Sequence, residues 1–441
     1  MKRPEIKTQL PGPEAKKILA DDELFISPSY TRSYPMVAKK GNGCWVEDVD
    51  GNTYLDFNAG IAVCSTGHCH PEVVEAIKKQ AEELIHMSGT DFYYPQQVEL
   101  AKKLAEIAPG DNAKRVFLSN SGAEANEAAI KLARYHTKRQ YIIAFYGAFH
   151  GRTYGAMSLT ASKYVQRKHF APLVPGVIHV PYPNPYRPPF SKDVSPEKVA
   201  EEVVQFIEEV VFNTVAPAEE VAAIIAEPIQ GEGGYVVPPD NFFPLLKKLC
   251  EKYGILLIID EVQAGMGRTG KMFAIEHFGI EPDIISVAKG IASGMPLGAT
   301  IASRDVMDWP PGAHATTFGG NPVSCAAALK TIELLQNELI ENAARQGEYL
   351  LGELKKFMDE FEFIGDVRGK GLMIGVEIVK DRETKERDGA LRDKIVDEAF
   401  RKGLLLLGAG ANVIRFCPPL VVTKEEIDVA LEILRDVMKS V

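Results

Sequence analysis

Lys289 and Asp260 each end an apolar run that is typical of a buried strand. The run at residues 284–287 is separated from Lys289 by one residue, and the run at residues 255–259 leads directly into Asp260. An amine at the end of a buried strand loses its water shell, which favours the neutral, nucleophilic form that condenses to a Schiff base. A buried carboxylate can hold a pyridine nitrogen in its protonated form. The pair therefore predicts chemistry based on pyridoxal 5′-phosphate.

A second candidate segment, residues 119–126, follows a predicted strand and opens a predicted helix from residue 124 to about 136. Ser121, Gly122 and Ala123 are small, so backbone N–H groups at this helix start can approach an anion closely. The same residues also fit an ordinary serine N-cap with no ligand. The segment on its own leaves both interpretations open.

Residues 146–153 place an aromatic ring, an imidazole and a guanidinium around Gly151. Phe149 could stack on a heteroaromatic cofactor, and Arg152 could bind a carboxylate through two parallel hydrogen bonds. Taken alone, Phe149 equally fits the core and Arg152 equally fits the surface.

Two acids and a distant arginine form the fourth candidate. Glu227 and Glu232 lie on a glycine-rich loop after a strand, while Arg415 stands between apolar neighbours far along the chain. A buried arginine needs an anionic partner. Glu232 and a substrate carboxylate are the two candidates for that partner.

The elements that position these residues alternate in type. Short apolar runs at 115–118, 141–144, 223–226, 255–259, 284–287 and 299–302 alternate with amphipathic helical stretches. This pattern predicts an α/β domain with a mainly parallel sheet. Ligands collect at the carboxyl ends of such strands, so the candidate residues should meet in one crevice.

The chain is predicted to form two domains. Residues 70–325 make the large α/β domain, and residues 1–69 and 326–441 together make a smaller α+β domain. The smaller domain is expected to contain a hairpin around residues 45–52, a long helix from 323 to about 357 and a glycine-punctuated strand at 365–377.

The bulk properties favour small-molecule chemistry. The 441 residues carry a net charge of −10, which argues against binding to nucleic acid or to anionic membranes. The sequence has no membrane-spanning stretch and no targeting segment, so a cytoplasmic location is expected. No metal site is predicted, because the cluster at residues 67–71 holds neighbouring side chains that rarely converge on one ion.

Together the motifs closely resemble those of the class III (ω-amino acid) aminotransferases. The matching segments are 121–125, 149–152, 227–234, 260–265, Lys289 and 316–322. They cover about residues 45–420 in the order found in that family. The resemblance implies fold type I, pyridoxal 5′-phosphate as cofactor, and a homodimer or higher homo-oligomer with shared active sites.

The resemblance also implies roles for individual residues. Lys289 resembles the Schiff-base lysine, Asp260 the partner of the pyridine nitrogen, and Val262 the residue under the ring. Gln263 resembles the ligand of the ring hydroxyl, and Thr317 the residue that reaches the phosphate from the other subunit. The full set of expected cofactor contacts is Ser121, Gly122, Ala123, Phe149, His150, Asp260, Val262, Gln263, Lys289 and Thr317.

Substrate contacts follow in the same way. Arg415 resembles the clamp for an α-carboxylate, Glu232 its gating partner, and Arg152 the position for a distal carboxylate. Ile61 stands where ornithine-specific relatives carry a tyrosine, which favours 4-aminobutyrate. Asp91 could hold the second ammonium of ornithine or lysine, although a helix cap is an equal interpretation of this residue.

The sequence therefore predicts an aminotransferase that moves the amino group of 4-aminobutyrate, ornithine or lysine to 2-oxoglutarate. The main alternative is an amino-acid racemase or epimerase on the same scaffold, with Glu232 as the nearest candidate for a second acid. A decarboxylase, an aminomutase and a cofactor-binding regulator without activity are less favoured, the last because Lys289 and Asp260 stand in intact motifs.

Overall fold

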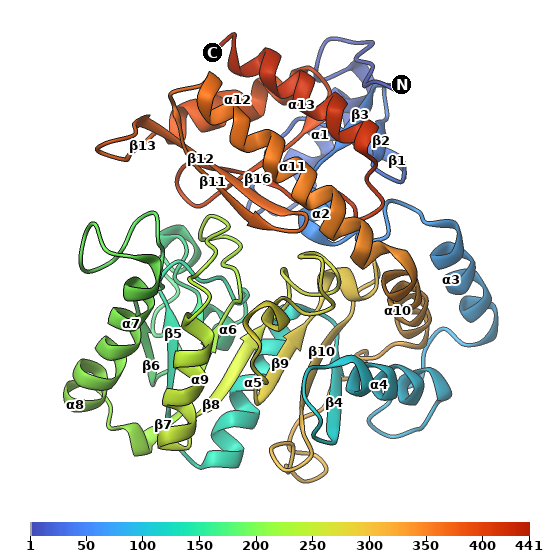
Figure 1. Cartoon of the computed structure of the whole chain (residues 1–441). Helices are drawn as coiled ribbons and strands as arrows, with labels where there is room; N and C mark the ends of the chain where they lie inside the picture. The colour runs from blue at the N-terminus through green and yellow to red at the C-terminus, as the bar shows by residue number, and fades with distance from the viewer. Residues whose placement is uncertain (1) are drawn as a thin grey trace.

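The computed structural model describes residues 2–441, and its centre is a seven-stranded sheet (Figure 1). The strand order is β4-β10-β9-β8-β7-β5-β6, and β10 alone runs antiparallel to its neighbours. The strands are β4 (Lys114–Ser119), β5 (Tyr141–Phe145), β6 (Val177–Val180), β7 (Val221–Ala226), β8 (Leu256–Asp260), β9 (Ile284–Val287) and β10 (Gly298–Ser303). The predicted mainly parallel sheet is confirmed.

Every predicted strand of this sheet is present. The central strands read as unbroken apolar runs because both faces of the sheet are covered, and all residues of β7 are buried. The prediction missed β6, which has four residues, lies at the edge of the sheet and is mostly half-buried. An edge strand of this kind lacks the continuous apolar run by which the others were found.

Helices cover the two faces of the sheet. Ile258 of β8 packs in one apolar cluster with α5 (Gly122–Thr137), while its neighbours Leu257 and Ile259 pack in another cluster with α9 (Phe242–Tyr253). Alternate residues of a strand point to opposite faces, so α5 and α9 lie on opposite sides of the sheet. The remaining helices of this region are α3 (Pro71–Glu83), α4 (Pro95–Ile107), α6 (Tyr154–Leu159), α7 (Pro196–Phe206) and α8 (Phe212–Thr214).

Both ends of the chain contribute to the upper part of the molecule in Figure 1. One sheet has the order β1-β2-β3-β14 and another β11-β12-β16-β15. Their strands are β1 (Ala38–Asn42), β2 (Trp45–Asp48), β3 (Thr53–Asp56), β11 (Ile364–Lys370), β12 (Met373–Asp381), β14 (Leu404–Leu405), β15 (Leu407–Ala409) and β16 (Val413–Phe416), with β13 (Glu386–Arg387) beside β12. The predicted N-terminal hairpin is confirmed as the antiparallel pair β2–β3.

The single strand expected at 365–377 is wrong. The chain forms two antiparallel strands there, β11 and β12, joined by a tight turn. Gly371 adopts a φ of 53° in this turn, and a Cβ on it would lie 2.3 Å from the backbone carbon of Thr269. The glycines therefore mark a turn and a close backbone approach, not the interior of one strand.

A long helical rod joins the two regions. It consists of α10 (Pro322–Leu334), a π-helical turn (Leu335–Leu339) and α11 (Ile340–Glu360), which confirms the predicted long helix. The predicted domain boundary at residue 325 falls inside α10, and the division into two domains stays a prediction.

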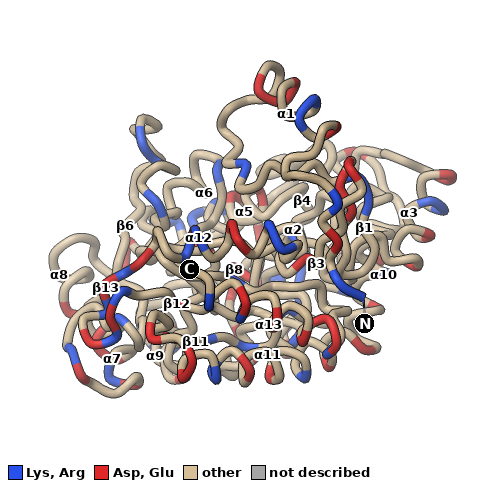
Figure 2. The backbone as a smooth tube through the Cα atoms, turned by 90° about the horizontal axis from the view of Figure 1, so that it is seen from above, with Lys and Arg blue, Asp and Glu red and all other residues tan. Residues whose placement is uncertain are grey.

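The N-terminal segment contacts the last helix of the chain. Arg3 pairs with Glu432 of α13 (Lys424–Met438) at 2.6 Å, and α12 (Gly389–Arg401) packs beside α13. Figure 2 shows residues of both charge signs interspersed along α11 and α13, and α1 (Pro13–Phe25) projecting from the rest of the chain. Among residues 2–441, no helix is long and apolar enough to cross a membrane.

Candidate active site

The carboxyl ends of five strands open onto one cavity of about 400 Å³. The loops after β4, β5, β7, β8 and β9 each contribute to its wall, as expected for a sheet of this kind. The predicted residues that line it are Ser121, Gly122, Ala123, Phe149, His150, Arg152, Asp260, Val262, Gln263 and Lys289.

The start of α5 forms one end of the cavity. Ser121 is its N-cap, and the Ser121 hydroxyl accepts a hydrogen bond from the backbone N–H of Glu124 at 3.2 Å. The first N–H groups of a helix have no partner within the helix, so those of Gly122 and Ala123 remain suited to an anion. The serine cap and the anion site proposed for this segment are therefore compatible.

Gly122 is required by close packing at this helix start. A Cβ on this residue would lie 2.6 Å from Cγ1 of Val262, whose side chain forms part of the cavity wall. Gly122→Ala is expected to weaken cofactor binding about tenfold, because overpacking of this kind costs roughly 1–3 kcal/mol. Equilibrium dialysis of the bound cofactor measures the effect. Gly352→Ala is the matched control, since no atom lies within 4 Å of the Cβ position there. Equal affinity in the two variants would contradict the prediction.

Asp260 is held by three donors at the base of the cavity. Its Oδ2 accepts hydrogen bonds from Asn126 Nδ2 and from His150 Nδ1, both at 2.7 Å, and its Oδ1 accepts from the Val262 N–H at 2.9 Å. Burial opposes the charged imidazolium, but the hydrogen bond to Asp260 outweighs it and raises the pKa of His150. The aspartate is therefore fixed in place by three hydrogen-bond donors.

Lys289 faces this cluster from the end of β9. Burial lowers the pKa of its amine, and the positive charge of Arg415 lowers it further, against the opposing effect of Glu232. The residue adopts a φ of 48°. This left-handed conformation is costly for lysine, and such strain is typical of positions that a functional site holds in place.

Glu227 joins two of the loops that surround the cavity. Its two carboxylate oxygens accept hydrogen bonds from the Phe149 N–H at 3.0 Å and from the Gly231 N–H at 2.8 Å. Burial raises the pKa of Glu227 to about 7. The side chain thus ties the loop that carries Phe149 to the loop that carries Glu232.

Arg415 and Glu232 meet across the two regions of the chain. Arg415 lies on β16, Glu232 follows β7, and Arg415 Nη1 donates to Glu232 Oε1 at 2.6 Å. Burial acts against both charges, but Arg415 outweighs it and lowers the pKa of Glu232. Glu232 therefore stays ionised, and of the two candidate partners for Arg415 it is the one in contact.

Two further side chains of the cavity have defined neighbours. The Arg152 guanidinium lies 5.4 Å from the centre of the Phe149 ring. Gln263 Oε1 accepts a hydrogen bond from the Tyr235 hydroxyl at 2.9 Å, which fixes the orientation of its amide. Phe149 and Gln263 both line the cavity.

Five predicted residues do not line the cavity: the paired Glu232 and Arg415, together with Ile61, Asp91 and Thr317. Ile61 lies in the short turn α2 (Ala59–Ala62), where residues 59–62 all have positive φ, and this turn leads to Val63 in the cavity wall. Asp91 and Thr317 are exposed. Asp91 is not a helix cap, because the N-cap of α4 is Tyr94.

Sequence reasoning gave no role to Asn126 or Lys163, and it named Glu227 as a candidate acid without finding its partners. All three contact predicted site residues. Asn126 lies one helical turn after Gly122, so its place on the cavity side of α5 could have been found from that spacing. The partners of Glu227 are backbone N–H groups, and Lys163 reaches Glu232 from an irregular loop, so neither contact leaves a signal in the sequence.

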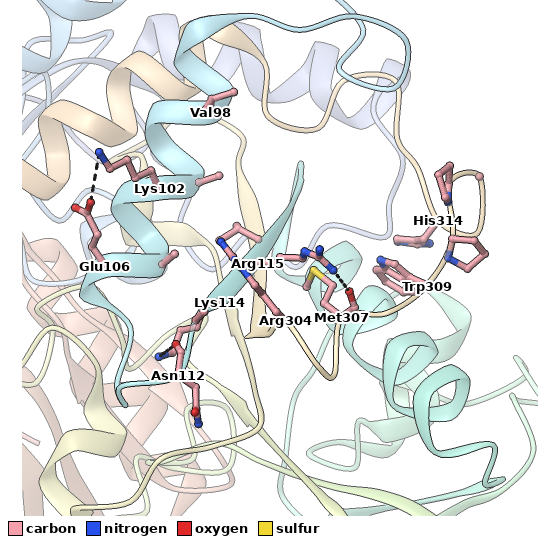
Figure 3. A pocket seen from close by; sticks show the side chains of 17 residues that line it. Val98, Lys102, Glu106, Asn112, Lys114, Arg115, Arg304, Met307, Trp309 and His314 are labelled. Carbon is pink, nitrogen blue, oxygen red and sulfur yellow. Dashed lines mark hydrogen bonds and ion pairs between the residues drawn. The ribbon is translucent and has the colours of Figure 1, made fainter.

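A larger hollow lies away from these residues (Figure 3). It has a volume of about 910 Å³ and is open, with Lys102, Arg115, Arg304, Trp309 and His314 in its wall. It shares no residue with the cavity at the strand ends. No group of three or more His, Cys, Asp or Glu side chains within residues 2–441 is arranged to hold a metal ion, and His68 pairs with Asp56 at 2.7 Å.

The model of the family "Aminotransferase class-III" matches residues 26–438. The chain belongs to the class III aminotransferase family. The resemblance inferred from the motifs is thereby confirmed, together with fold type I and the assignment as an enzyme.

Individual relatives of this class III chain carry different names. The chain is 45% identical to an alanine/serine racemase of Pyrococcus horikoshii over 100% of its own length and 94% of that protein. It is 44% identical to an acetylornithine aminotransferase of Methanothermobacter thermautotrophicus, and the match covers 97% of this chain and 100% of that protein. A solved (S)-enantioselective ω-transaminase from Thermomicrobium roseum superposes with a TM-score of 0.90 and is 37% identical in sequence. The match covers 97% of this chain and 98% of that structure.

Class III aminotransferases act on amino acids and 2-oxo acids and use pyridoxal 5′-phosphate. The cavity fits that cofactor. Asn126 Oδ1 and His150 Nε2 are buried in its wall and have no hydrogen-bond partner within residues 2–441. Buried polar atoms without partners are costly, so a polar ligand in this space stabilises the site.

Proposed function

We propose that the protein is an aminotransferase that moves the amino group of an ω-amino acid to 2-oxoglutarate, giving a semialdehyde and glutamate. The observation that carries this proposal is the ion pair between Arg415 and Glu232 beside Lys289. An arginine that is paired with an acid of the same chain can bind an α-carboxylate in one half-reaction. In the other half-reaction it can stay paired with that acid and bind no substrate group.

The bound cofactor would supply an electron sink for the charge that develops when the substrate carbon loses its proton. Asp260, fixed by Asn126 and His150, is suited to keep the ring nitrogen protonated. Lys289 has a lowered pKa, so its neutral amine is suited to take a proton from the substrate carbon that bears the amino group and would deliver it to the cofactor carbon on the other side of the nitrogen. The start of α5 would bind the phosphate.

Substrate carboxylates are assigned to two arginines. Arg152 would bind the carboxylate far from the reacting amine in both half-reactions. Arg415 would bind the α-carboxylate of glutamate or 2-oxoglutarate after Glu232 turns away, and would stay paired with Glu232 when an ω-amine reacts. This dual use follows from the buried pair, because a free Arg415 would repel an incoming ammonium group.

Glu232→Ala is expected to shift the preference toward glutamate about tenfold relative to 4-aminobutyrate. The variant leaves Arg415 permanently unpaired, which aids an α-carboxylate and opposes an ω-ammonium group, a difference worth roughly 1–2 kcal/mol. The ratio of kcat/KM for the two donors measures the shift. An unchanged ratio would rule out the gating role, and Glu219→Ala, on the exposed surface before β7, is the control.

The identity of the ω-amine is a choice among 4-aminobutyrate, ornithine and lysine. Ile61 favours 4-aminobutyrate, because it offers no hydroxyl for a second polar group. Asp91 favours ornithine or lysine if it approaches the site of a second copy of the chain. A half-reaction in the absence of any oxo acid tests the proposal: bleaching of the visible cofactor absorbance by one of the three amines supports it and names the donor.

The second candidate function is an amino-acid racemase, which the alanine/serine racemase relative supports. Racemisation needs a proton donor on the face opposite Lys289. Glu232 is the candidate acid for this role, but Arg415 lowers its pKa and so holds it ionised. Loss of optical rotation of L-alanine or L-leucine, with the cofactor absorbance retained and no amine transferred, would favour this candidate over the first.

The proposal includes a homodimer with shared sites. Thr317 and Asp91 are exposed on the single chain. Large apolar side chains close to them in sequence, Phe318 and Tyr93, are exposed as well. In this arrangement Thr317 would reach the phosphate in the partner's cavity. Sedimentation of the protein as a single chain would contradict this part of the proposal.

A further inference from the structure

Glu232 lies between two cations, and the second of them has no role in the proposed function. While Oε1 accepts from Arg415, Oε2 lies 3.5 Å from Nζ of Lys163. The two cations differ in environment: 6% of the Arg415 side chain is exposed, against 41% of the Lys163 side chain. The carboxylate thus has an inner, buried partner and an outer, hydrated one.

The backbone around this arrangement is fixed on both sides. The carbonyl of Glu232 accepts a hydrogen bond from the Gly410 N–H at 2.8 Å. Ala161, two residues before Lys163, donates to the Ala148 carbonyl at 2.8 Å and accepts from the Gly147 N–H at 3.1 Å. Movement of the Glu232 carboxylate between the two cations therefore requires side-chain rotation and no rearrangement of the loops.

We propose that Lys163 is the second partner of Glu232 in the proposed gating mechanism, and that it holds this carboxylate when an α-carboxylate takes its place on Arg415. The inference rests on the proposed function. An ionised carboxylate that leaves a buried arginine needs another cation or water, because a charge left without a partner in a part-buried site is destabilising. Lys163 supplies that cation, which makes it a positioning residue for dicarboxylate substrates.

Removal of Lys163 affects the two positions of Glu232 unequally. With Glu232 on Arg415, the inner pair at 2.6 Å persists without the lysine. With Glu232 turned outward, Lys163 is the cation it turns to, so its loss disfavours this state more. Ligands that need Arg415 to be released should bind more weakly, and ligands that need only Arg152 should not.

The test uses the cofactor-loaded enzyme and two ligands that do not react, glutarate and butanoate, with dissociation constants from calorimetry. Lys163→Met is expected to raise the Kd of glutarate about fivefold, as for a part-exposed ion pair, and that of butanoate less than about twofold. Lys163→Arg should restore glutarate binding. Lys168→Met, on the same exposed segment, is the matched control and should change neither constant.

A double-mutant cycle separates this role from direct binding of substrate by Lys163. In the Glu232→Ala background no carboxylate remains to pass from Arg415 to Lys163, so Lys163→Met should no longer change the Kd of glutarate. A Lys163 effect that persists in that background, equal weakening of both ligands, or no glutarate binding by the unaltered enzyme would each overturn the inference. These measurements involve no turnover, so they stand apart from the donor test of the proposed function.

Discussion

Lys289→Ala is expected to lower kcat by about 10⁴-fold or more, because the same amine holds the cofactor and moves the proton. Among the described residues, Lys289 is the only lysine of the cavity wall, and its lowered pKa suits it to both tasks. Reduction with borohydride should fix the cofactor covalently to the unaltered chain and not to the variant. Peptide mass spectrometry then locates the attachment, with a readout independent of activity.

Lys271→Ala serves as the control for this variant. Lys271 is exposed in the loop between β8 and β9 and lies outside the cavity wall. It should retain both activity and covalent fixation. Covalent attachment of the cofactor to another lysine in the Lys289→Ala variant would contradict the assignment. Methylamine added to this variant should restore a small part of the lost activity.

Asp260→Asn is expected to lower kcat about 10³-fold, in the range seen when one preorganised electrostatic partner is removed from a site. A neutral amide cannot stabilise a positive ring nitrogen. It would also present an N–H group to the environment of Asn126 and His150, which now donate to the aspartate. The variant should bind cofactor and still turn over slowly, and the measurement is kcat per bound cofactor.

Asp283→Asn tests whether any paired carboxylate beside the sheet has this effect. Asp283 pairs with Lys247 at 3.0 Å and lies before β9, at the end of the strand opposite Lys289. Its replacement should reduce stability and leave kcat within about twofold of the unaltered enzyme, since surface and part-buried pairs contribute about 1 kcal/mol or less. A similar loss of kcat in both variants would remove the special role of Asp260.

The crevice could be predicted from the sequence because its residues follow long apolar runs. β7, β8 and β9 are buried on both faces, so their sequences mark where each strand ends and which polar residue comes next. The topology of a parallel sheet then brings Glu227, Asp260 and Lys289 to one edge. No knowledge of side-chain packing is needed for this step.

The contacts between loops could not be predicted in this way. Glu227 is bound by two backbone N–H groups, which every residue except proline carries, so the sequence does not mark its partners. Lys163 and Glu232 are 69 positions apart and meet because two irregular loops fold over each other. The contribution of Thr317 and Asp91 to a partner's site stays a prediction, since it depends on a second copy of the chain.

The parallel pairing of β3 with β14 joins residues 55–56 to residues 404–405 and has a consequence for biosynthesis. The ribosome makes β3 early and β14 near the end, at about 5–20 residues per second, so β3 waits roughly 20–70 seconds for its partner. During that time Tyr54, Leu55 and Phe57, fully buried in the finished chain, have no β14 to pack against. The nascent N-terminal segment is therefore a natural client for chaperones, and chains that stop before residue 404 should be removed by proteolysis.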